Sequence, residues 1–458
     1  MDLRAGFAIL AGKCSARVLR LLGKGGTSLP GRIVTKLCPD ILGRLAKNMK
    51  IIAVTGTNGK TTTCHIIRDI LQESGYSLFC NDSGANLLQG VVSSFVEAAS
   101  LGGKIPCEVA LLECDEAAMQ SIVKHFGNLD VTVVVTNIFR DQLDRYGEVL
   151  VTVNKIKEAL QYIPQAKLCL NADCSLTTSL KDMPNGGVTF FGVDKPLYES
   201  SSTDISDAVY CLHCKTKYQY KYRTFGHLGG FYCDHCGYRR QDSDVSIDRV
   251  ISWEDVGATV ALQIHGKEYE ARVSLPGGYN LYNALAALTA GVVMEIPEET
   301  MMPVLGRLTT HFGRMEQVAL GDSVLHLVLV KNPAGFNEVI QYLMQRKPAG
   351  NIVFGLNDNY ADGKDVSWIY DVEFERMLSC VGAVKNFYFT GIRAYDMQVR
   401  LKYAGFPTEK FLVEKDYKTL IGSLQPQGCE NYLVLSYTSM LAFRDALSEF
   451  VHLDKYKA

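Results

Sequence analysis

Residues 49–62 read Met-Lys-Ile-Ile-Ala-Val-Thr-Gly-Thr-Asn-Gly-Lys-Thr-Thr, and this stretch decides the fold of the chain. Its first half is apolar and β-branched, as in a buried strand, and its second half is a glycine turn. Residues 61–74 follow with apolar side chains at helical spacing. A strand, a glycine turn and a helix in this order cradle phosphate, because backbone N–H groups and the positive helix end face the anion. The turn departs from the usual G-x-x-x-x-G-K-[ST] loop, because Val54 stands at the position of its first glycine.

This loop predicts a site for ATP and Mg²⁺. Lys60 would reach the β- and γ-phosphates, and Thr61 would place its hydroxyl on the magnesium ion. The cofactor-binding residues expected in the loop are Gly56, Thr57, Asn58, Gly59, Lys60, Thr61 and Thr62.

Strands and helices alternate beyond the loop. Residues 109–112 and 131–135 are short β-branched or aliphatic runs that predict strands, and residues 117–126 between them predict a helix. Strands that alternate with helices are typical of a parallel sheet covered on both faces. The fold class expected is therefore α/β.

The pattern changes after about residue 174. Residues 185–275 contain short strands, turns and paired cysteines, which indicates an inserted or antiparallel section, and residues 281–293 predict a helix rich in Ala and Leu. A second α/β pattern begins near residue 314, with strands predicted at 324–330, 352–356 and 386–390. We therefore expect an N-terminal helical segment, a central ATP-binding domain and a C-terminal α/β domain, at residues 1–48, 49–312 and 313–458.

The bulk composition is that of a globular protein with two or three domains, because 458 residues exceed one ordinary core. A formal net charge of −2 gives no electrostatic reason to expect a nucleic-acid partner. Apolar residues near the N-terminus are interrupted by Arg4, Lys13, Arg17 and Arg20, so this segment predicts neither a membrane span nor a signal peptide. We expect a helix that packs on the rest of the protein.

Four of the fourteen cysteines form two Cys-x₂-Cys pairs, Cys211/Cys214 and Cys233/Cys236. Eighteen residues separate the pairs, which predicts a zinc ribbon at about residues 205–245 with four thiolate ligands. Because four cysteines fill a tetrahedral site, the zinc is expected to be structural, and His213 and His235 are expected at the surface. The other cysteines have no framework spacing, so we expect free thiols and a cytoplasmic protein.

The phosphate loop and the motifs that follow it resemble those of Mur ligases and folylpolyglutamate synthetases. The matches follow in family order, and the resemblance covers nearly the whole chain. They are Thr55-Gly-Thr-Asn-Gly-Lys-Thr-Thr62, Glu113-Cys-Asp-Glu116, Thr136-Asn137 with Asp141-Gln-Leu-Asp144, Asn171-Ala-Asp173, Asn280-Leu-Tyr-Asn283 and Gly313-Arg-Met-Glu316. The resemblance implies Mg²⁺ on Glu113 and ATP near Asn137, Asn171, Asp173, Asn280 and Arg314, with Lys60, Glu113 and Arg314 acting in catalysis.

The departures from the family pattern are specific. Gln142 stands where the family has the histidine of its D-H-L-D segment. Lys331-Asn-Pro333 stands where the family has the end of D-Y-A-H-N-P. Only 48 residues precede the loop strand, which is too few for a UDP-binding domain. Together with the cysteine ribbon and residues 355–368, these features resemble the MurT branch, the ligase-like subunits of lipid II isoglutaminyl synthase.

That branch implies an ATP-dependent amidation. The D-glutamate α-carboxyl of the lipid II stem peptide would be phosphorylated, and ammonia would attack the acyl phosphate to leave D-isoglutamine, at the inner face of the membrane. The implied partner is a GatD-like class I glutamine amidotransferase subunit, whose Cys and His are completed by an aspartate of the ligase subunit. Among Asp358, Asp362, Asp365 and Asp371 we expect Asp365 to take this role.

Two other functions remain open from the sequence. One is a ligase of the same fold that adds an amino acid, which ATP turnover with an amino-acid acceptor would identify. The other is a zinc-ribbon ATPase that binds nucleic acid, which salt-dependent DNA or RNA binding would identify.

Overall fold

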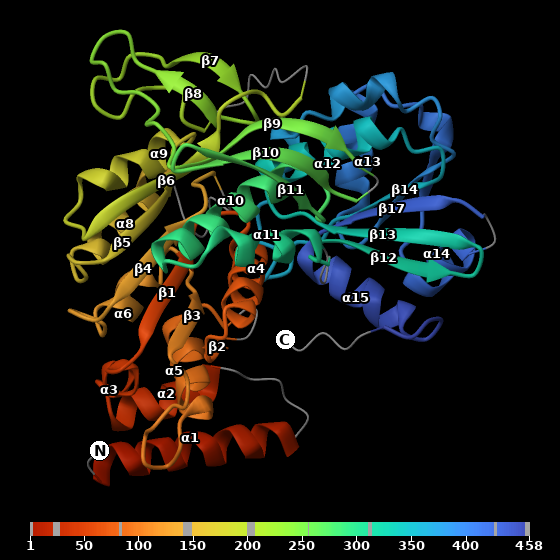
Figure 1. Cartoon of the computed structure of the whole chain (residues 1–458). Coiled ribbons are helices and arrows are strands. Elements are labelled where there is room, and N and C mark those ends of the chain that lie inside the picture. Colours follow the sequence, from red (N-terminus) through yellow and green to blue (C-terminus); the bar gives the residue numbers. More distant parts are fainter. Residues whose placement is uncertain are drawn as a thin grey trace.

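The computed structural model describes residues 3–21, 28–81, 85–140, 149–198, 207–254, 256–309, 314–425 and 428–453. Two large sheets organise these residues (Figure 1). The first contains strands between residues 50 and 273, and the second contains strands between residues 314 and 435. The α/β class predicted from the sequence is confirmed for both parts.

The first sheet has nine strands in the order β11-β10-β9-β6-β5-β4-β1-β3-β2. The run from β9 to β2 is parallel, and β10 and β11 are antiparallel additions at one edge. Their bounds are β1 Lys50–Thr55, β2 Leu78–Cys80, β3 Val109–Glu113, β4 Val131–Val135, β5 Lys167–Asn171, β6 Gly187–Val193, β9 Val245–Trp253, β10 Ala258–Ile264 and β11 Lys267–Val273. Of the section predicted as inserted or antiparallel, residues 185–275, β6 and β9 continue the parallel sheet and β10 and β11 extend it with antiparallel pairing.

Strand β1 lies between β3 and β4, third from the β2 edge of this sheet, and its last five residues are buried. Because parallel strands end at the same edge, the residues that follow β1, β3 and β4 meet there. The outer edges are β2, with three residues, and β11, whose exposed side chains are mostly charged. The ends of the interior strands β4, β1 and β3 therefore carry the site.

The helices of this part follow the predicted pattern. Helix α4 (Lys60–Glu73) packs on β1 and β3, and α10 (Gly278–Val293) packs on α4, β4, β5 and β6. In α4 the apolar residues at helical spacing, Ile66, Ile67, Ile70 and Leu71, are all buried. The other helices are α5 Leu88–Ala98, α6 Met119–Val123, α8 Val149–Leu160, α9 Ser175–Thr178, η1 Ser179–Asp182 and α11 Glu298–Gly306.

Three helices precede β1: α1 Leu3–Leu21, α2 Ser28–Leu37 and α3 Ile41–Ala46. As predicted, α1 packs on the protein, against α2 and α5, through Ala5, Ala8, Ile9 and Gly12 (Figure 1). No helix among the described residues has the length and apolar content needed to cross a membrane.

The second sheet has the order β12-β13-β17-β14-β15-β16, in which only β12 is antiparallel. The strands are β12 Arg314–Leu320, β13 Ser323–Leu329, β14 Ile352–Gly355, β15 Phe387–Thr390, β16 Phe411–Val413 and β17 Glu430–Leu435. The helices are α12 Pro333–Arg346, η2 Ser367–Asp371, η3 Phe374–Ser379, α13 Ala394–Tyr403, η4 Thr408–Lys410, α14 Tyr417–Leu424 and α15 Tyr437–Leu447. The end of β13 faces the first sheet, which brings α12 next to the β1–α4 loop (Figure 1).

A two-stranded ribbon, β7 Gln219–Arg223 with β8 Gly229–Tyr232, projects from the first part and carries the four paired cysteines on its flanks (Figure 1).

Candidate functional site

The β1–α4 loop has the conformation that its glycines predict. Gly56 and Gly59 have φ of 121° and 86°, which favour glycine. A Cβ at Gly59 would lie 2.0 Å from Oδ1 of Asn283, and one at Gly56 would lie 2.4 Å from Oγ1 of Thr136. Gly59 is the N-cap of α4, and no side chain caps the helix there. The first-turn N–H groups of α4 are thus left without a side-chain cap, as anion binding requires.

Lys60 is buried in this loop. Its Nζ donates to the Gly56 carbonyl at 2.6 Å and to Oε1 of Glu116 at 2.8 Å. Burial opposes the charge on Lys60, but the Glu116 carboxylate outweighs it and raises the pKa of Lys60 above its ordinary value. Lys60 therefore stays charged, and its closest anionic partner in this structure is Glu116. The sequence contained Glu116 within the quoted acidic segment but did not indicate this pairing.

The acidic residue Glu113 ends β3 beside Lys60. Asn81 positions its backbone, because Asn81 accepts from Glu113 N at 2.8 Å and donates to Glu113 O at 2.9 Å. The side chain is buried and its charge acts on Lys60. Thr61, half-buried at the start of α4, lies on the same loop. A carboxylate and a hydroxyl are the oxygen ligands that Mg²⁺ prefers, so these two residues fit a magnesium site.

Asn58 is held from three sides. Its backbone N donates to Oδ1 of Asn137 at 3.0 Å, and its carbonyl accepts from Thr136 and from Asn137 Nδ2 at 2.7 and 3.1 Å. Its side-chain Oδ1 accepts from Nδ2 of Asn332 at 3.0 Å. Asn332 belongs to the C-terminal part, so this hydrogen bond joins the two parts of the chain at the loop. Thr57 is fixed in the same way by Phe139, whose backbone N and O both bond to its hydroxyl.

Asn171 and Asp173 lie inside the protein, although the family resemblance predicts that they approach adenosine. Asn171 donates to the Thr136 carbonyl at 2.9 Å. The Asp173 carboxylate accepts from Arg240 at 2.6 Å and from the Tyr282 hydroxyl at 2.6 Å. Burial raises the pKa of Asp173, against the opposing effect of Arg240. Both side chains are fully buried, so in this structure they brace the floor of the site.

Asn280 and Asn283, one turn apart on α10, form a chain of hydrogen bonds toward the loop. Asn283 donates to Asn280 Oδ1 at 3.0 Å, and Asn280 donates to the Pro276 carbonyl at 2.7 Å. Asn283 reaches Gly59, as the close approach above requires.

A cavity opens between the two parts of the chain. One wall contains Asn58, Gly59 and Asn137, and the opposite wall contains residues 328–332 and α12. Tyr279, Tyr282 and Phe225 supply aromatic surface. A cavity that joins a phosphate loop to a second domain has the form of a nucleotide and substrate cleft.

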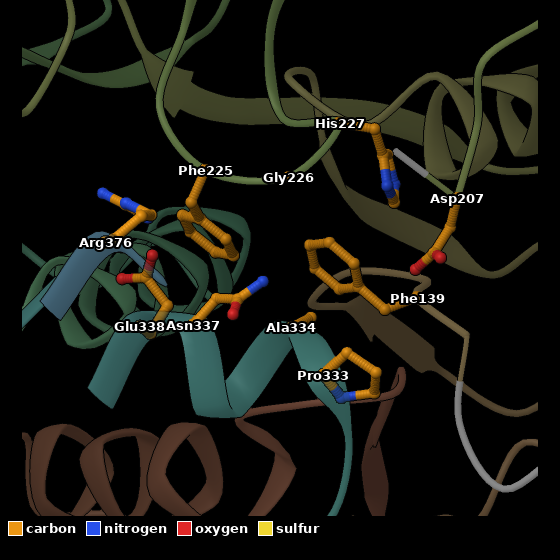
Figure 2. Close-up of a pocket in the computed structure, with 10 residues that line it drawn as sticks. All are labelled: Phe139, Asp207, Phe225, Gly226, His227, Pro333, Ala334, Asn337, Glu338 and Arg376. Atoms are coloured by element: carbon orange, nitrogen blue, oxygen red, sulfur yellow. The ribbon is translucent and has the colours of Figure 1, made fainter. Parts of the chain in front are cut away.

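A second, smaller cavity (Figure 2) adjoins the first and shares Phe225, Ala334 and Glu338 with it. Burial raises the pKa of Glu338 to about 8. On the other side, His227 Nε2 lies 3.4 Å from Sγ of Cys174. Both residues of this pair are fully buried, so a large substrate has no access to the thiol.

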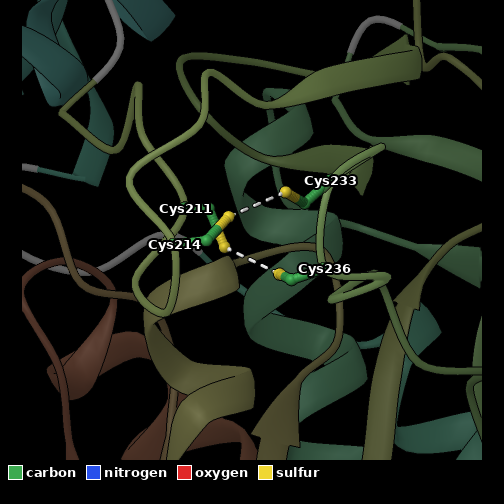
Figure 3. A group of neighbouring side chains, drawn as sticks. All are labelled: Cys211, Cys214, Cys233 and Cys236. Carbon is green, nitrogen blue, oxygen red and sulfur yellow. Dashed lines mark hydrogen bonds between the residues drawn. The ribbon is translucent and has the colours of Figure 1, made fainter.

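The four paired cysteines converge as predicted (Figure 3). Their sulfur atoms all lie within 4.8 Å of one another, and the Cys211–Cys236 and Cys214–Cys233 separations are 3.5 and 3.4 Å. Four sulfurs about 2.3 Å from a central zinc ion form a tetrahedron with edges of roughly 3.8 Å, so this set fits zinc. His213 and His235 are exposed, as expected.

The two cysteine knuckles have the same backbone turn. Cys211 O accepts from Lys215 N and Cys233 O accepts from Gly237 N, both at 3.0 Å. Lys215 and Gly237 occupy matching left-handed positions, with φ of 63° and 75°. Tyr238 fastens the ribbon to α9, because its hydroxyl donates to the Ser175 carbonyl at 2.7 Å.

The aspartates of residues 358–371 differ in their partners. Asp358 pairs with Arg393 at 2.9 Å, Asp371 pairs with Arg140, and Asp362 accepts from Thr438 N at 2.8 Å. Asp365 is exposed and accepts from Ser367, whose backbone N lies at 2.8 Å. Hydrogen bonds from the side chain and the backbone of Ser367 lower the pKa of Asp365.

Three sequence features cannot be placed. Gln142 and the segment 141–144 lie outside the described residues, as does Gly313. Arg314 opens β12, but its side chain lies outside the described part of the chain. The sequence analysis did not single out Glu338, Glu116 or Asn332. Glu338 could have been identified, because it is an acidic residue four positions from both Ala334 and Tyr342 in the same helix.

Comparisons with known proteins agree with this geometry. The Mur ligase middle domain model matches residues 54–291, and the MurT ligase C-terminal model matches residues 329–440. Solved structures with a similar fold include a pseudomurein peptide ligase type C from Methanothermus fervidus (TM-score 0.64, 20% identity, 88% of this chain and 79% of that chain). MurF from Acinetobacter baumannii is also similar (TM-score 0.65, 15% identity, 92% and 80%).

Curated relatives extend over nearly the whole chain. The lipid II isoglutaminyl synthase (glutamine-hydrolyzing) subunit MurT of Streptococcus pneumoniae (strain ATCC BAA-255 / R6) is 34% identical over 98% of each chain. The protein of the same name from Staphylococcus aureus (strain COL) is 32% identical over 96% of this chain and 97% of the relative. The chain therefore belongs to the MurT family, within the Mur ligases.

Proposed function

We propose that this chain is the ligase subunit of a lipid II isoglutaminyl synthase. It would use ATP to phosphorylate the D-glutamate α-carboxyl of the lipid II stem peptide, and ammonia would displace the phosphate to form D-isoglutamine. The observation that carries the proposal is the cavity between the phosphate loop and α12, in a chain similar to MurT subunits from end to end.

The residues of the loop have separate roles in this proposal. The uncapped start of α4 and the charged Lys60 would hold the phosphates, and Thr61 and Glu113 would hold Mg²⁺. The bound metal would neutralise charge on the transferring phosphoryl group. Asn137, Asn283 and Asn332 fix the loop before ATP binds, which removes an ordering cost from binding. Arg314 remains a proposed ATP contact on the basis of the family resemblance.

The ammonia is proposed to come from a GatD-like glutamine amidotransferase subunit. Asp365 is exposed, has no ion pair among the described residues and stands on a surface turn, which supports it as the aspartate that would orient the partner's histidine. The other three aspartates of this region are engaged within the chain.

We also propose that the four cysteines hold a structural zinc ion and that the central and C-terminal domains divide near residue 313. Zinc content by elemental analysis, and a fall in thermal stability on chelation, would support the metal site. A chain without zinc and with an unchanged melting temperature would refute it.

The test of the function is amidation of lipid II by the chain with ATP, Mg²⁺ and either ammonium or glutamine, with and without the partner subunit. We expect ammonium to serve without the partner and glutamine only with it. Asp365→Asn should abolish the use of glutamine and spare the use of ammonium. Asp322→Asn, the same change in the exposed turn between β12 and β13, is the matched control and should affect neither.

Transfer of an amino acid to the acceptor by the isolated chain would contradict the amidation and identify an amino-acid-adding ligase instead.

A further inference from the structure

Glu338 stands where the two cavities meet. It lines both of them, together with Phe225 and Ala334 (Figure 2). The larger cavity continues from Glu338 to Asn58 and Gly59 of the phosphate loop. The smaller cavity continues to His227 and Asp207 (Figure 2). A small molecule that passes from the smaller cavity to the larger one would therefore meet this carboxyl group.

The Glu338 side chain is only 5% exposed, and its Oε2 atom has no hydrogen-bond partner in the described part of the chain. The backbone of Tyr279 donates a hydrogen bond to this carboxyl group. The nearby Arg376 is engaged elsewhere, with Glu373 at 3.2 Å and with Gln341. An unpartnered buried carboxyl oxygen costs free energy, which suggests a ligand that donates to it.

The surroundings suit a small cation that becomes a small neutral molecule. Phe139 and Phe225 are stacked with ring centroids 5.6 Å apart, and both line the smaller cavity. Pro333 and Ala334 add apolar surface. Aromatic faces attract ammonium, and an apolar wall favours the neutral form once the proton has left.

We propose that Glu338 binds an ammonium ion between the two cavities, takes one proton from it and releases ammonia toward the phosphate loop. The inference rests on the proposed function, because it assigns a further catalytic residue to that reaction.

The step balances. Ammonium gives one proton to the Glu338 carboxylate and becomes ammonia. The nitrogen lone pair forms a bond to the carbonyl carbon of the acyl phosphate, and the carbon–oxygen bond to phosphate breaks with its electron pair on the oxygen. One further N–H proton leaves with hydrogen phosphate, and the amide remains. Glu338 then loses its proton to water.

The charged and titratable groups around Glu338 allow this proton transfer near neutral pH. Burial raises the pKa of Glu338 to about 8, and Arg376 on η3 opposes this rise. Tyr198, on the segment after β6, is buried and stays protonated, because burial and then Glu338 raise its pKa. His227 faces the smaller cavity, and Lys331 lines the larger one beside α12. A carboxyl group that titrates near neutral pH is suited to act as a general base.

The test compares two nucleophiles in Glu338→Gln, with lipid II, ATP and Mg²⁺ in the intact chain. Ammonium must lose a proton before it attacks, whereas hydroxylamine is already neutral at pH 7 and traps the same acyl phosphate as a hydroxamate. We expect kcat/KM for ammonium to fall by about 10²-fold or more, while hydroxamate formation is nearly unchanged. The deficit should be constant below about pH 8 and shrink above it, because Glu338 is then already the carboxylate while the solution supplies more free ammonia.

Two further variants complete the design. Glu338→Asp keeps the carboxylate and should retain more ammonium activity than Glu338→Gln. Glu409→Gln makes the same chemical change at an exposed position of the C-terminal part and should behave as the unmodified chain.

Unchanged ammonium use in Glu338→Gln would overturn the inference. An equal loss with both nucleophiles would also overturn it, since it would indicate a role in substrate binding or folding. If the unmodified chain makes neither amide nor hydroxamate from lipid II, the proposed function itself fails.

Discussion

Two strand-to-helix turns face the same cavity. They differ in whether a side chain caps the backbone N–H groups at the start of the helix. The β1–α4 turn ends at Gly59, which has a φ of 86° and provides no side-chain cap. The β13–α12 turn ends at Asn332, whose side chain accepts from Gly335 N at 2.9 Å. The hydrogen bond from Asn332 to Asn58 joins the two turns at 3.0 Å.

This difference indicates that one turn binds a ligand and that the other turn has a supporting role. An uncapped helix start keeps its N–H groups for an external anion, whereas a capped one has already used part of this capacity. We infer that the first turn receives the phosphates, and that the second closes the cavity and places Glu338 one turn into α12. Substitutions at matched positions of the two turns can test this division.

Lys60→Met is expected to have the largest effect, because it removes the buried cation of the first turn. Loss of one preorganised electrostatic contact lowers kcat by about 10²–10³-fold. Glu116 would be left as an unpaired buried charge, which costs about 3–5 kcal/mol of stability. ATP-dependent lipid II amidation and thermal unfolding measure the two effects. Lys331→Met in the second turn should cost much less activity, and equal losses would contradict the division.

The double variant Lys60→Met/Glu116→Gln separates charge burial from catalysis. It should recover much of the lost stability, because the unpaired carboxylate is gone, and should remain inactive.

Gly59→Ala and Gly335→Ala form a matched glycine pair. At Gly59 a Cβ would lie 2.0 Å from Asn283, and the left-handed backbone alone costs about 1–2 kcal/mol for a non-glycine residue. At Gly335 the nearest atom is 3.2 Å away, and alanine favours the helix by about 0.5–1 kcal/mol. The first variant should lose the rise in melting temperature caused by ATP, and the second should keep it. Equal behaviour would show that the first loop does not need its glycine.

Glu338→Gln should change how stability depends on pH. The folded-state pKa of Glu338 is raised to about 8, while an unfolded carboxyl group titrates near 4.3. The raised pKa contributes stability that is present below about pH 4 and is lost as pH rises toward 8. The glutamine variant lacks this loss, so its stability relative to the unmodified chain should rise across that window, by about 1.4 kcal/mol per pKa unit. Denaturant unfolding at several pH values measures it, and a difference independent of pH would refute it.

Asn332→Ala is expected to have the smallest effect, because it removes one cap and one contact between the parts of the chain. The loss should be about 1 kcal/mol. Asn332→Ser keeps a capping oxygen and should recover most of this stability. A large loss of phosphate binding in Asn332→Ala would mean that the second turn does more than support the first.

Local patterns predicted most of the elements. The strands at 109–112 and 131–135 were predicted within one residue of β3 and β4, and the predicted strand, glycine turn and helix at residues 49–74 correspond to β1, the turn after it and α4. The helix predicted at 117–126 is shorter, because only Met119–Val123 is helical. The contacts across the site were not predicted. Lys60 and Glu116 are 56 residues apart, and Asn58 and Asn332 are 274 apart, so no periodicity connects them. The burial of Asp173 depends on Arg240 and Tyr282 in the same way.

The edges of the nine-stranded sheet determine how the chain can meet other chains. Edge strands offer unpaired backbone groups to which a foreign strand can add, and proteins limit this with short or charged edges. Strand β2 offers three residues, and β11 exposes Lys267, Glu268, Glu270 and Arg272. This sheet therefore resists aggregation by strand addition, and a partner that docks on the central part of the chain would bind through side chains and loops rather than by extending the sheet.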